Sequence, residues 1–125
     1  MNKKIMCWGA AFALFSVILG AFGAHALKEV LTDSQLNSFE TAVRYQMYHG
    51  LALLILGFHA EQLPKFKLLS TLLITGTLLF SGSIYLLNIQ EAIGISLSFL
   101  GPITPVGGLF LISGWALLLL SLIKK

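Results

Sequence analysis

The chain has 125 residues, of which 57% are hydrophobic and only 10% are charged. Soluble domains carry about 25% charged residues, so this chain has too few charges to coat a surface that faces water. The composition therefore excludes an ordinary soluble domain and predicts a surface that faces lipid.

Four apolar segments are each long enough to cross a hydrocarbon core of about 30 Å. They cover residues 5–26, 40–61, 67–88 and 105–123. Together they take up most of the chain and leave no room for a soluble domain. The sequence predicts a single-domain, all-α integral membrane protein over residues 1–125, built as an antiparallel bundle of four transmembrane helices.

The basic residues predict the orientation of this bundle. Six of them lie beside segment ends that share one side of the membrane: Lys3, Lys4, Lys65, Lys67, Lys124 and Lys125. Only Lys28 and Arg44 belong to the other side. By the positive-inside rule, both termini are cytoplasmic in a multi-pass protein of the plasma (inner) membrane. The net charge of +3 does not indicate nucleic-acid binding, because the basic residues form no continuous stripe.

The first segment resembles a signal peptide with a cleavage site near residues 24–26, but its apolar run is longer than a usual signal core. Small residues also repeat along one helical face of the segment. They are Gly9, Ala13, Ser16, Gly20 and Gly23. Such a stripe lets membrane helices approach closely, so we expect a retained helix. Cys7 is expected to be a small buried apolar side chain.

Local signals mark the helix ends. Thr32 and Gln35 have the spacing of a capping box, which predicts that the second helix begins near Asp33, before its apolar part. Pro64 predicts a short turn before the third helix. Thr104 followed by Pro105 predicts the N-cap and first residue of the fourth helix.

The antiparallel order brings polar residues from four separate segments to the outer half of the bundle. The candidate ligand-binding residues are His25, Arg44, Tyr45, His49, Ser81, Tyr85, Thr104, Gly107 and Gly108. Convergent polar groups inside an apolar bundle are typical of a binding site. The glycine pair would let a ligand approach the backbone and would offer amides at a helix start.

Arg44 lies four residues after Glu40, the favourable order for an ion pair on a helix. It is also close enough to the segment end to reach the lipid headgroups. A role at the surface and a buried role both remain open for Arg44.

His49 lies about 10 Å inside the apolar segment, too deep to reach water. An imidazole there needs a hydrogen-bond partner. It is therefore either part of a functional site or a neutral residue that holds helices together. The candidate partners are Tyr85, Thr104 and, through water, His25.

Four motifs in order resemble the domain-of-unknown-function 423 family of small four-span bacterial membrane proteins. They are LGAFGAHAL (19–27), YQMYHGLALL (45–54), FSGSIYLL (80–87) and TPVGGLFLISGW (104–115). The resemblance implies four spans and a plasma-membrane location, and it brings no established activity. The family pattern does not include Glu40 or Arg44. The residues that match it are His25, Tyr45, Gln46, His49, Ser81, Gly82, Tyr85, Thr104, Pro105, Gly107, Gly108 and Trp115.

The leading hypothesis is a polar pocket in the outer half of the bundle that binds or passes a small molecule, a lipid headgroup or an ion. The alternative is a structural or assembly accessory protein whose polar cluster only fixes helix packing. The sequence predicts no cofactor and no metal site, and its lack of a catalytic set argues against an enzyme. The expected partners are the lipid bilayer, a small-molecule or lipid ligand and a second copy of the chain.

Overall fold

The computed structural model describes residues 1–124 and contains four long helices. They are α1 (Lys3–His25), α2 (Asp33–Phe58), α3 (Phe66–Ile93) and α4 (Ile103–Ile123). Short 3₁₀ turns lie in the connections: Leu27–Glu29, Ala60–Gln62 and Ser98–Leu100. No strand occurs in residues 1–124, so the all-helical prediction is confirmed.

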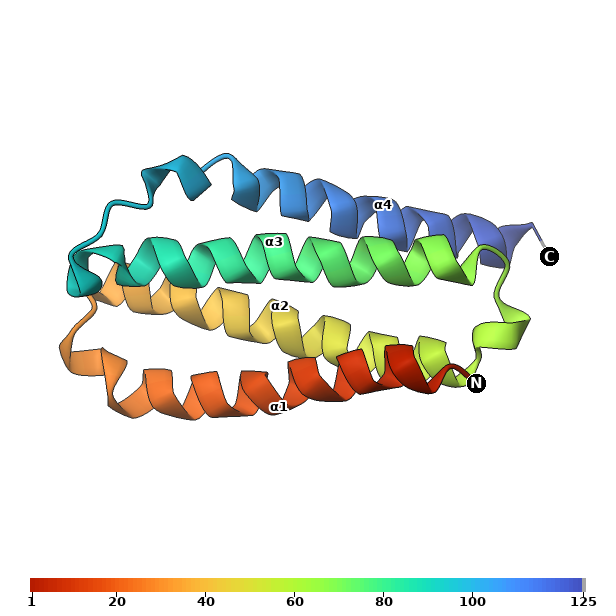
Figure 1. Cartoon of the computed structure of the whole chain (residues 1–125), viewed down its shortest axis with the longest axis horizontal. Coiled ribbons are helices and arrows are strands. Elements are labelled where there is room, and N and C mark those ends of the chain that lie inside the picture. Colours follow the sequence, from red (N-terminus) through yellow and green to blue (C-terminus); the bar gives the residue numbers. More distant parts are fainter. Residues whose placement is uncertain (125) are drawn as a thin grey trace.

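The helices lie side by side along the long axis, and successive helices run in opposite directions (Figure 1). α2 packs against both α1 and α3, while α4 packs chiefly against α3. Leucines from three helices and one phenylalanine from α1 make the buried core: Phe12, Leu53, Leu56, Leu69, Leu73 and Leu111.

The predicted start of α2 is confirmed. Thr32 is the N-cap; its hydroxyl accepts from the Gln35 amide, and the Gln35 side chain accepts from the Thr32 amide. These reciprocal bonds satisfy two backbone donors that a helix start leaves open. α2 therefore begins at Asp33, several residues before its apolar part.

The predicted start of α4 is wrong. α4 begins at Ile103 with Pro102 in the N-cap position, so Thr104 and Pro105 both lie within its first turn. The Thr104 hydroxyl is not used as a cap because it pairs with the hydroxyl of Ser83 on α3. The interhelical contact replaces the local one.

The predicted small-residue face of α1 is confirmed, and it meets a glycine of α2. A Cβ atom built on Gly9 would lie 2.6 Å from the Gly50 carbonyl oxygen, and one on Gly50 would lie 2.8 Å from the Gly9 carbonyl oxygen. No side chain fits at either position, so the two backbones touch. Cys7, by contrast, is exposed, and its expected burial is wrong because the contact face of α1 points to the other side.

Large apolar side chains also cover the outside of the helices. The exposed fraction of the residue surface is above one half at Leu14, Val17, Ile55, Leu109 and Ile112. Soluble monomers rarely expose so much apolar surface, and a hydrocarbon environment accounts for it.

Three segments are long and apolar enough to cross a membrane: Lys3–His25, Phe66–Ile93 and Ser98–Ile123. α2 is not among them, although its length is comparable. Polar residues along it, including Arg44, Gln46 and His49, reduce its hydropathy. The described residues thus give three candidate spans where the sequence predicted four.

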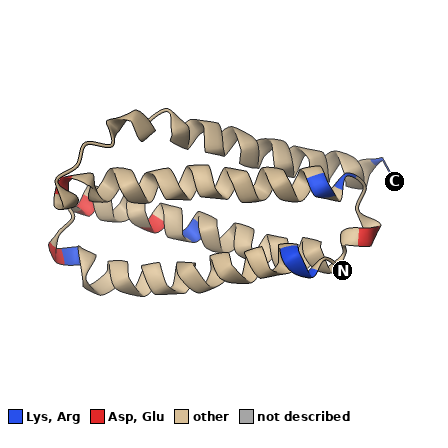
Figure 2. Cartoon of the chain, in the orientation of Figure 1, with Lys and Arg blue, Asp and Glu red and all other residues tan. Residues whose placement is uncertain are grey.

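Most charged residues gather at the two ends of the long axis, while Glu40 and Arg44 lie within α2 (Figure 2). The N-terminus and the last turn of α4 lie at the end that carries most of the lysines, whereas acidic residues predominate at the other end. Lys125, which contributed to the predicted orientation, lies outside the described residues. At the same end the N-terminal ammonium pairs with the Glu61 carboxylate, and this hydrogen bond lowers the pKa of Glu61.

The Gly9–Gly50 contact generates a stability prediction. Gly9→Ala should force α1 away from α2 and destabilise the protein by about 1–3 kcal/mol, the usual effect of overpacking. Thermal unfolding in detergent micelles measures the change. Gly82→Ala is the matched control, since a Cβ there has no neighbour within 4 Å. Equal melting temperatures for the two variants would contradict the close contact.

Candidate functional site

A stripe along α2 faces the inside of the protein and carries two strongly polar side chains. Ala42, Gln46, His49 and Leu53 follow one another at helical spacings of four, three and four, and all are buried. Gln46 is 7% exposed and His49 is 4% exposed. An unpaired polar group here would be costly, so the partners of these two residues define the site.

Gln46 connects three helices through its carboxamide. The Tyr85 hydroxyl on α3 donates to Gln46 Oε1 over 2.6 Å. Gln46 Nε2 in turn donates to the Phe12 carbonyl oxygen on α1 over 2.9 Å. Both ends of the carboxamide are therefore used, and the chain of bonds runs from α3 through α2 to α1.

Ser16 lies one turn after Phe12, whose carbonyl oxygen accepts from Gln46. A serine in a membrane helix usually donates to the carbonyl oxygen four residues earlier, which is that of Phe12. Gln46 already donates to this oxygen. Among the described residues, Ser16 Oγ is the one buried side-chain atom without a hydrogen-bond partner.

His49 uses both ring nitrogens. The indole Nε1 of Trp115 on α4 lies 2.9 Å from His49 Nε2. An indole N–H only donates, so His49 Nε2 accepts and the ring hydrogen sits on Nδ1. Nδ1 donates to the Tyr45 carbonyl oxygen over 2.7 Å. This arrangement requires a neutral imidazole.

The predicted partners of His49 were wrong. Tyr85 bonds Gln46, Thr104 pairs with Ser83, and His25 is exposed at the end of α1. Trp115 occupies the position instead, because it lies on the face of α4 that meets α2, and its ring packs edge-on against the imidazole at 5.8 Å.

Other hydroxyl and amide groups also join neighbouring helices. Ser81 Oγ on α3 donates to the Ala42 carbonyl oxygen on α2 over 2.8 Å. Nearer the end of α3, Asn88 Nδ2 donates to Ser38 Oγ over 3.0 Å. We refer to Gln46, His49, Ser81, Tyr85 and Trp115 as the interhelical polar cluster.

Arg44 lies outside this cluster. Its side chain is half exposed, and its guanidinium lies 4.0 Å from the Glu40 carboxylate. It also donates to Thr41 Oγ1 over 3.2 Å. The structure thus favours the surface role for Arg44, in an exposed pair of the kind that contributes little to stability.

Tyr45 contributes an aromatic ring contact, and Gly107 contributes a close contact between helix backbones. Tyr45 is 40% exposed, and its ring lies 4.9 Å from that of Phe80. Gly107 meets the α3 backbone, with a built Cβ 2.4 Å from the Phe80 amide nitrogen. Gly107 and Gly108 lie inside α4 rather than at its start, so their amides take part in helical hydrogen bonds.

Gln46 and Trp115 are the residues that the sequence did not single out as site residues. The stripe spacing could have revealed Gln46, because it shares the face of His49. Trp115 belongs to the TPVGGLFLISGW motif, but no spacing in the sequence connects it with His49. Its bond depends on where α4 is placed relative to α2.

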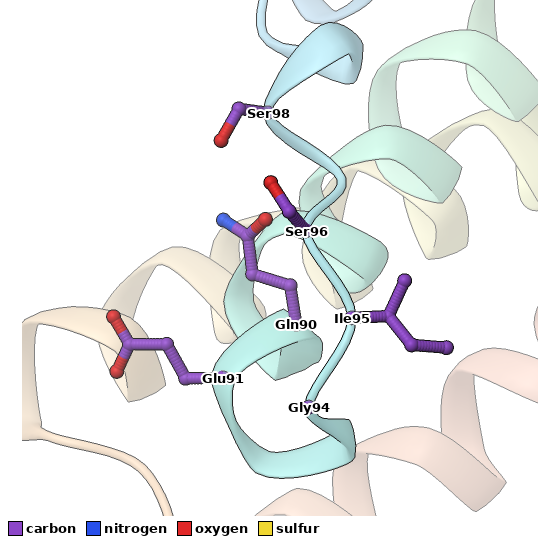
Figure 3. A pocket seen from close by; sticks show the side chains of 6 residues that line it. All are labelled: Gln90, Glu91, Gly94, Ile95, Ser96 and Ser98. Carbon is purple, nitrogen blue, oxygen red and sulfur yellow. The ribbon is translucent and has the colours of Figure 1, made fainter.

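The hollows of the molecule lie apart from most of the candidate residues. One, of about 350 Å³, is formed by the end of α3 and the following loop. There the Gln90 side chain points toward Ser96 while Glu91 points away (Figure 3). Gln90 Oε1 accepts from the Leu97 amide over 2.7 Å, so this carboxamide serves to hold the loop.

A second hollow, of about 270 Å³, lies between α1 and α3 with α2 beneath it. Apolar side chains form most of its lining, and Gln46, Thr77 and Tyr85 supply the polar part. The full lining is Phe12, Phe15, Leu19, Gln46, Thr77, Leu78, Gly82 and Tyr85. In the described residues no group of three metal-ligating side chains occurs.

Buried hydrogen bonds between apolar helices, with apolar side chains on the outside, define a helical integral membrane protein. The family described as "Protein of unknown function (DUF423)" matches residues 19–108, and the chain belongs to this family.

The chain is similar over nearly its whole length to named UPF0382 membrane proteins. It is 41% identical to SH2409 of Staphylococcus haemolyticus, covering 98% of this chain and 97% of the relative. It is 38% identical to YwdK of Bacillus subtilis, covering 98% of each chain. A fission yeast relative, C1782.12c of Schizosaccharomyces pombe, is 44% identical over 88% of this chain and 93% of its own. The family therefore extends beyond bacteria. No solved structure matches the chain.

The Tyr85–Gln46 bond can be tested by removing one oxygen atom. Tyr85→Phe should destabilise the protein by about 1 kcal/mol, a typical value for a hydrogen bond between membrane helices. Tyr48→Phe is the control, because Tyr48 is 55% exposed and its hydroxyl has no hydrogen bond within residues 1–124. Unfolding in detergent should separate the two variants, and similar stabilities would contradict the bond.

Proposed function

We propose that the chain crosses the plasma membrane four times, with both termini in the cytoplasm. Three spans follow from length and apolarity alone. α2 supplies the fourth, because its Gln46 and His49 side chains are buried and hydrogen-bonded within the protein. A helix of 26 residues is about 39 Å long, enough for the hydrocarbon core. The lysines near both termini support the orientation.

This orientation predicts the behaviour of reporter fusions. Alkaline phosphatase, which is active only outside the cytoplasm, should be inactive when fused after Lys124. The same enzyme fused after Gly94, in the loop between α3 and α4, should be active. A fluorescent protein that folds only in the cytoplasm should give the opposite pattern. An active phosphatase at both positions would contradict the proposed topology.

We further propose that the interhelical polar cluster fixes helix packing, in a structural or assembly accessory protein of the membrane. The observation that carries this proposal is the bond chain from Tyr85 through Gln46 to the Phe12 carbonyl. It uses both ends of the Gln46 carboxamide, and His49 likewise uses both nitrogens. Groups paired in this way have little capacity left for a ligand.

A binding pocket is the second candidate, and the hollow between α1 and α3 favours it. The hollow holds about 270 Å³ and combines apolar walls with the Gln46–Tyr85 pair. Of the nine candidate residues predicted from the sequence, Tyr85 lines it. A small amphiphilic molecule is the class of ligand that such a lining would accept.

Two variants separate the functions. Gln46→Leu removes the bond chain and keeps most of the volume. Gly82→Leu fills the hollow from a position where nothing lies within 4 Å of a new Cβ. A packing role predicts a lower melting temperature for Gln46→Leu and wild-type behaviour for Gly82→Leu. Native mass spectrometry should then find the same bound molecules in wild-type protein and in Gly82→Leu. Loss of one specific small molecule from Gly82→Leu, without a change in stability, would support the pocket instead.

A further inference from the structure

The end of the molecule where α1 and α3 begin carries a basic hollow, which is unrelated to the interhelical polar cluster. It lies between the first turns of α1 and α3 and has a volume of about 340 Å³. Its lining is Asn2, Lys4, Ile5, Phe66, Lys67, Ser70 and Thr71. Two lysines, one from each helix, thus face one space, and within the described residues no acidic side chain lines it.

The backbone adds further positive potential. α1 and α3 both begin at this hollow, and neither has an acidic residue in its first turn. In α3 the N-cap position is Lys65, which makes no side-chain cap bond. The first amides of α3 are therefore open donors, at the positive end of a helix dipole. The nearby Glu61 carboxylate is occupied by the N-terminal ammonium.

The same two helices form the apolar hollow further along their length. α1 and α3 run in the same direction, and eleven positions separate Lys4 from Phe15 and Lys67 from Leu78. At a rise of 1.5 Å per residue this is about 16 Å, close to half the hydrocarbon thickness of about 30 Å. Phe15 and Leu78 both line the apolar hollow.

We propose that the basic hollow binds the phosphate of an anionic glycerophospholipid, with an acyl chain lying along the α1–α3 surface toward the apolar hollow. The two lysines and the open amides of α3 match a phosphate diester. The apolar surface at one leaflet's depth matches the acyl chain, and a soluble phosphate would leave that surface unused. This proposal goes beyond the packing role and does not depend on it.

Native mass spectrometry of the detergent-purified protein with defined lipids tests the proposal. Wild-type protein should retain phosphatidylglycerol in preference to phosphatidylcholine of the same chain length. The double variant Lys4→Gln/Lys67→Gln should lose affinity for phosphatidylglycerol by about 10-fold or more, since each lysine contributes to anionic lipid binding. Lys4 and Lys67 are both exposed, so the melting temperature of this double variant should match that of the wild type.

The control is Lys28→Gln/Lys124→Gln, which removes the same charge from two lysines that do not line the basic hollow. It should leave the preference for phosphatidylglycerol unchanged. Equal losses in the two double variants, or no preference in wild-type protein, would overturn the proposal. Glycerol phosphate added alone should fail to displace the lipid. Displacement by this soluble headgroup at comparable concentration would identify a free phosphate as the occupant and would also overturn it.

Discussion

The carboxamide of Gln46 has to be paired wherever α2 lies, because neither lipid nor a leucine core offers it a hydrogen bond. In the folded chain it accepts from Tyr85 and donates to the Phe12 carbonyl. These two bonds link α2 to α1 and to α3. The same arrangement of helices contains the close contact of Gly9 with Gly50. It also contains the hydrogen bond from Ser81 to the Ala42 carbonyl. The imidazole of His49 also has to be paired, and on the side of α4 it accepts a hydrogen bond from Trp115.

The sequence predicts most of the fold because its signals are local. Apolar length marks the helices, the Thr32–Gln35 pair marks the start of α2, and the small-residue stripe marks the face of α1 that α2 covers. The start of α4 was misplaced, since the Thr104 hydroxyl bonds Ser83 on another helix. A rule that uses only neighbouring residues in the sequence cannot predict that contact.

The candidate site was predictable in kind and less so in detail. Burial of His49 follows from its depth in an apolar segment, and so does its need for a partner. The identity of that partner depends on the crossing of α2 and α4, which no spacing in the sequence encodes. For Arg44 a local signal was enough. Its spacing of four residues from Glu40 allowed a surface ion pair, and the structure has Arg44 exposed beside Glu40.

Two of these interhelical bonds end on a main-chain carbonyl: that of Gln46 on Phe12 and that of Ser81 on Ala42. A main-chain oxygen is present whatever residue occupies the position. Mutation at the accepting position can therefore change size or shape without deleting the acceptor, whereas the donor must keep its chemistry. At these two contacts the requirement for a polar side chain therefore falls on the donor alone.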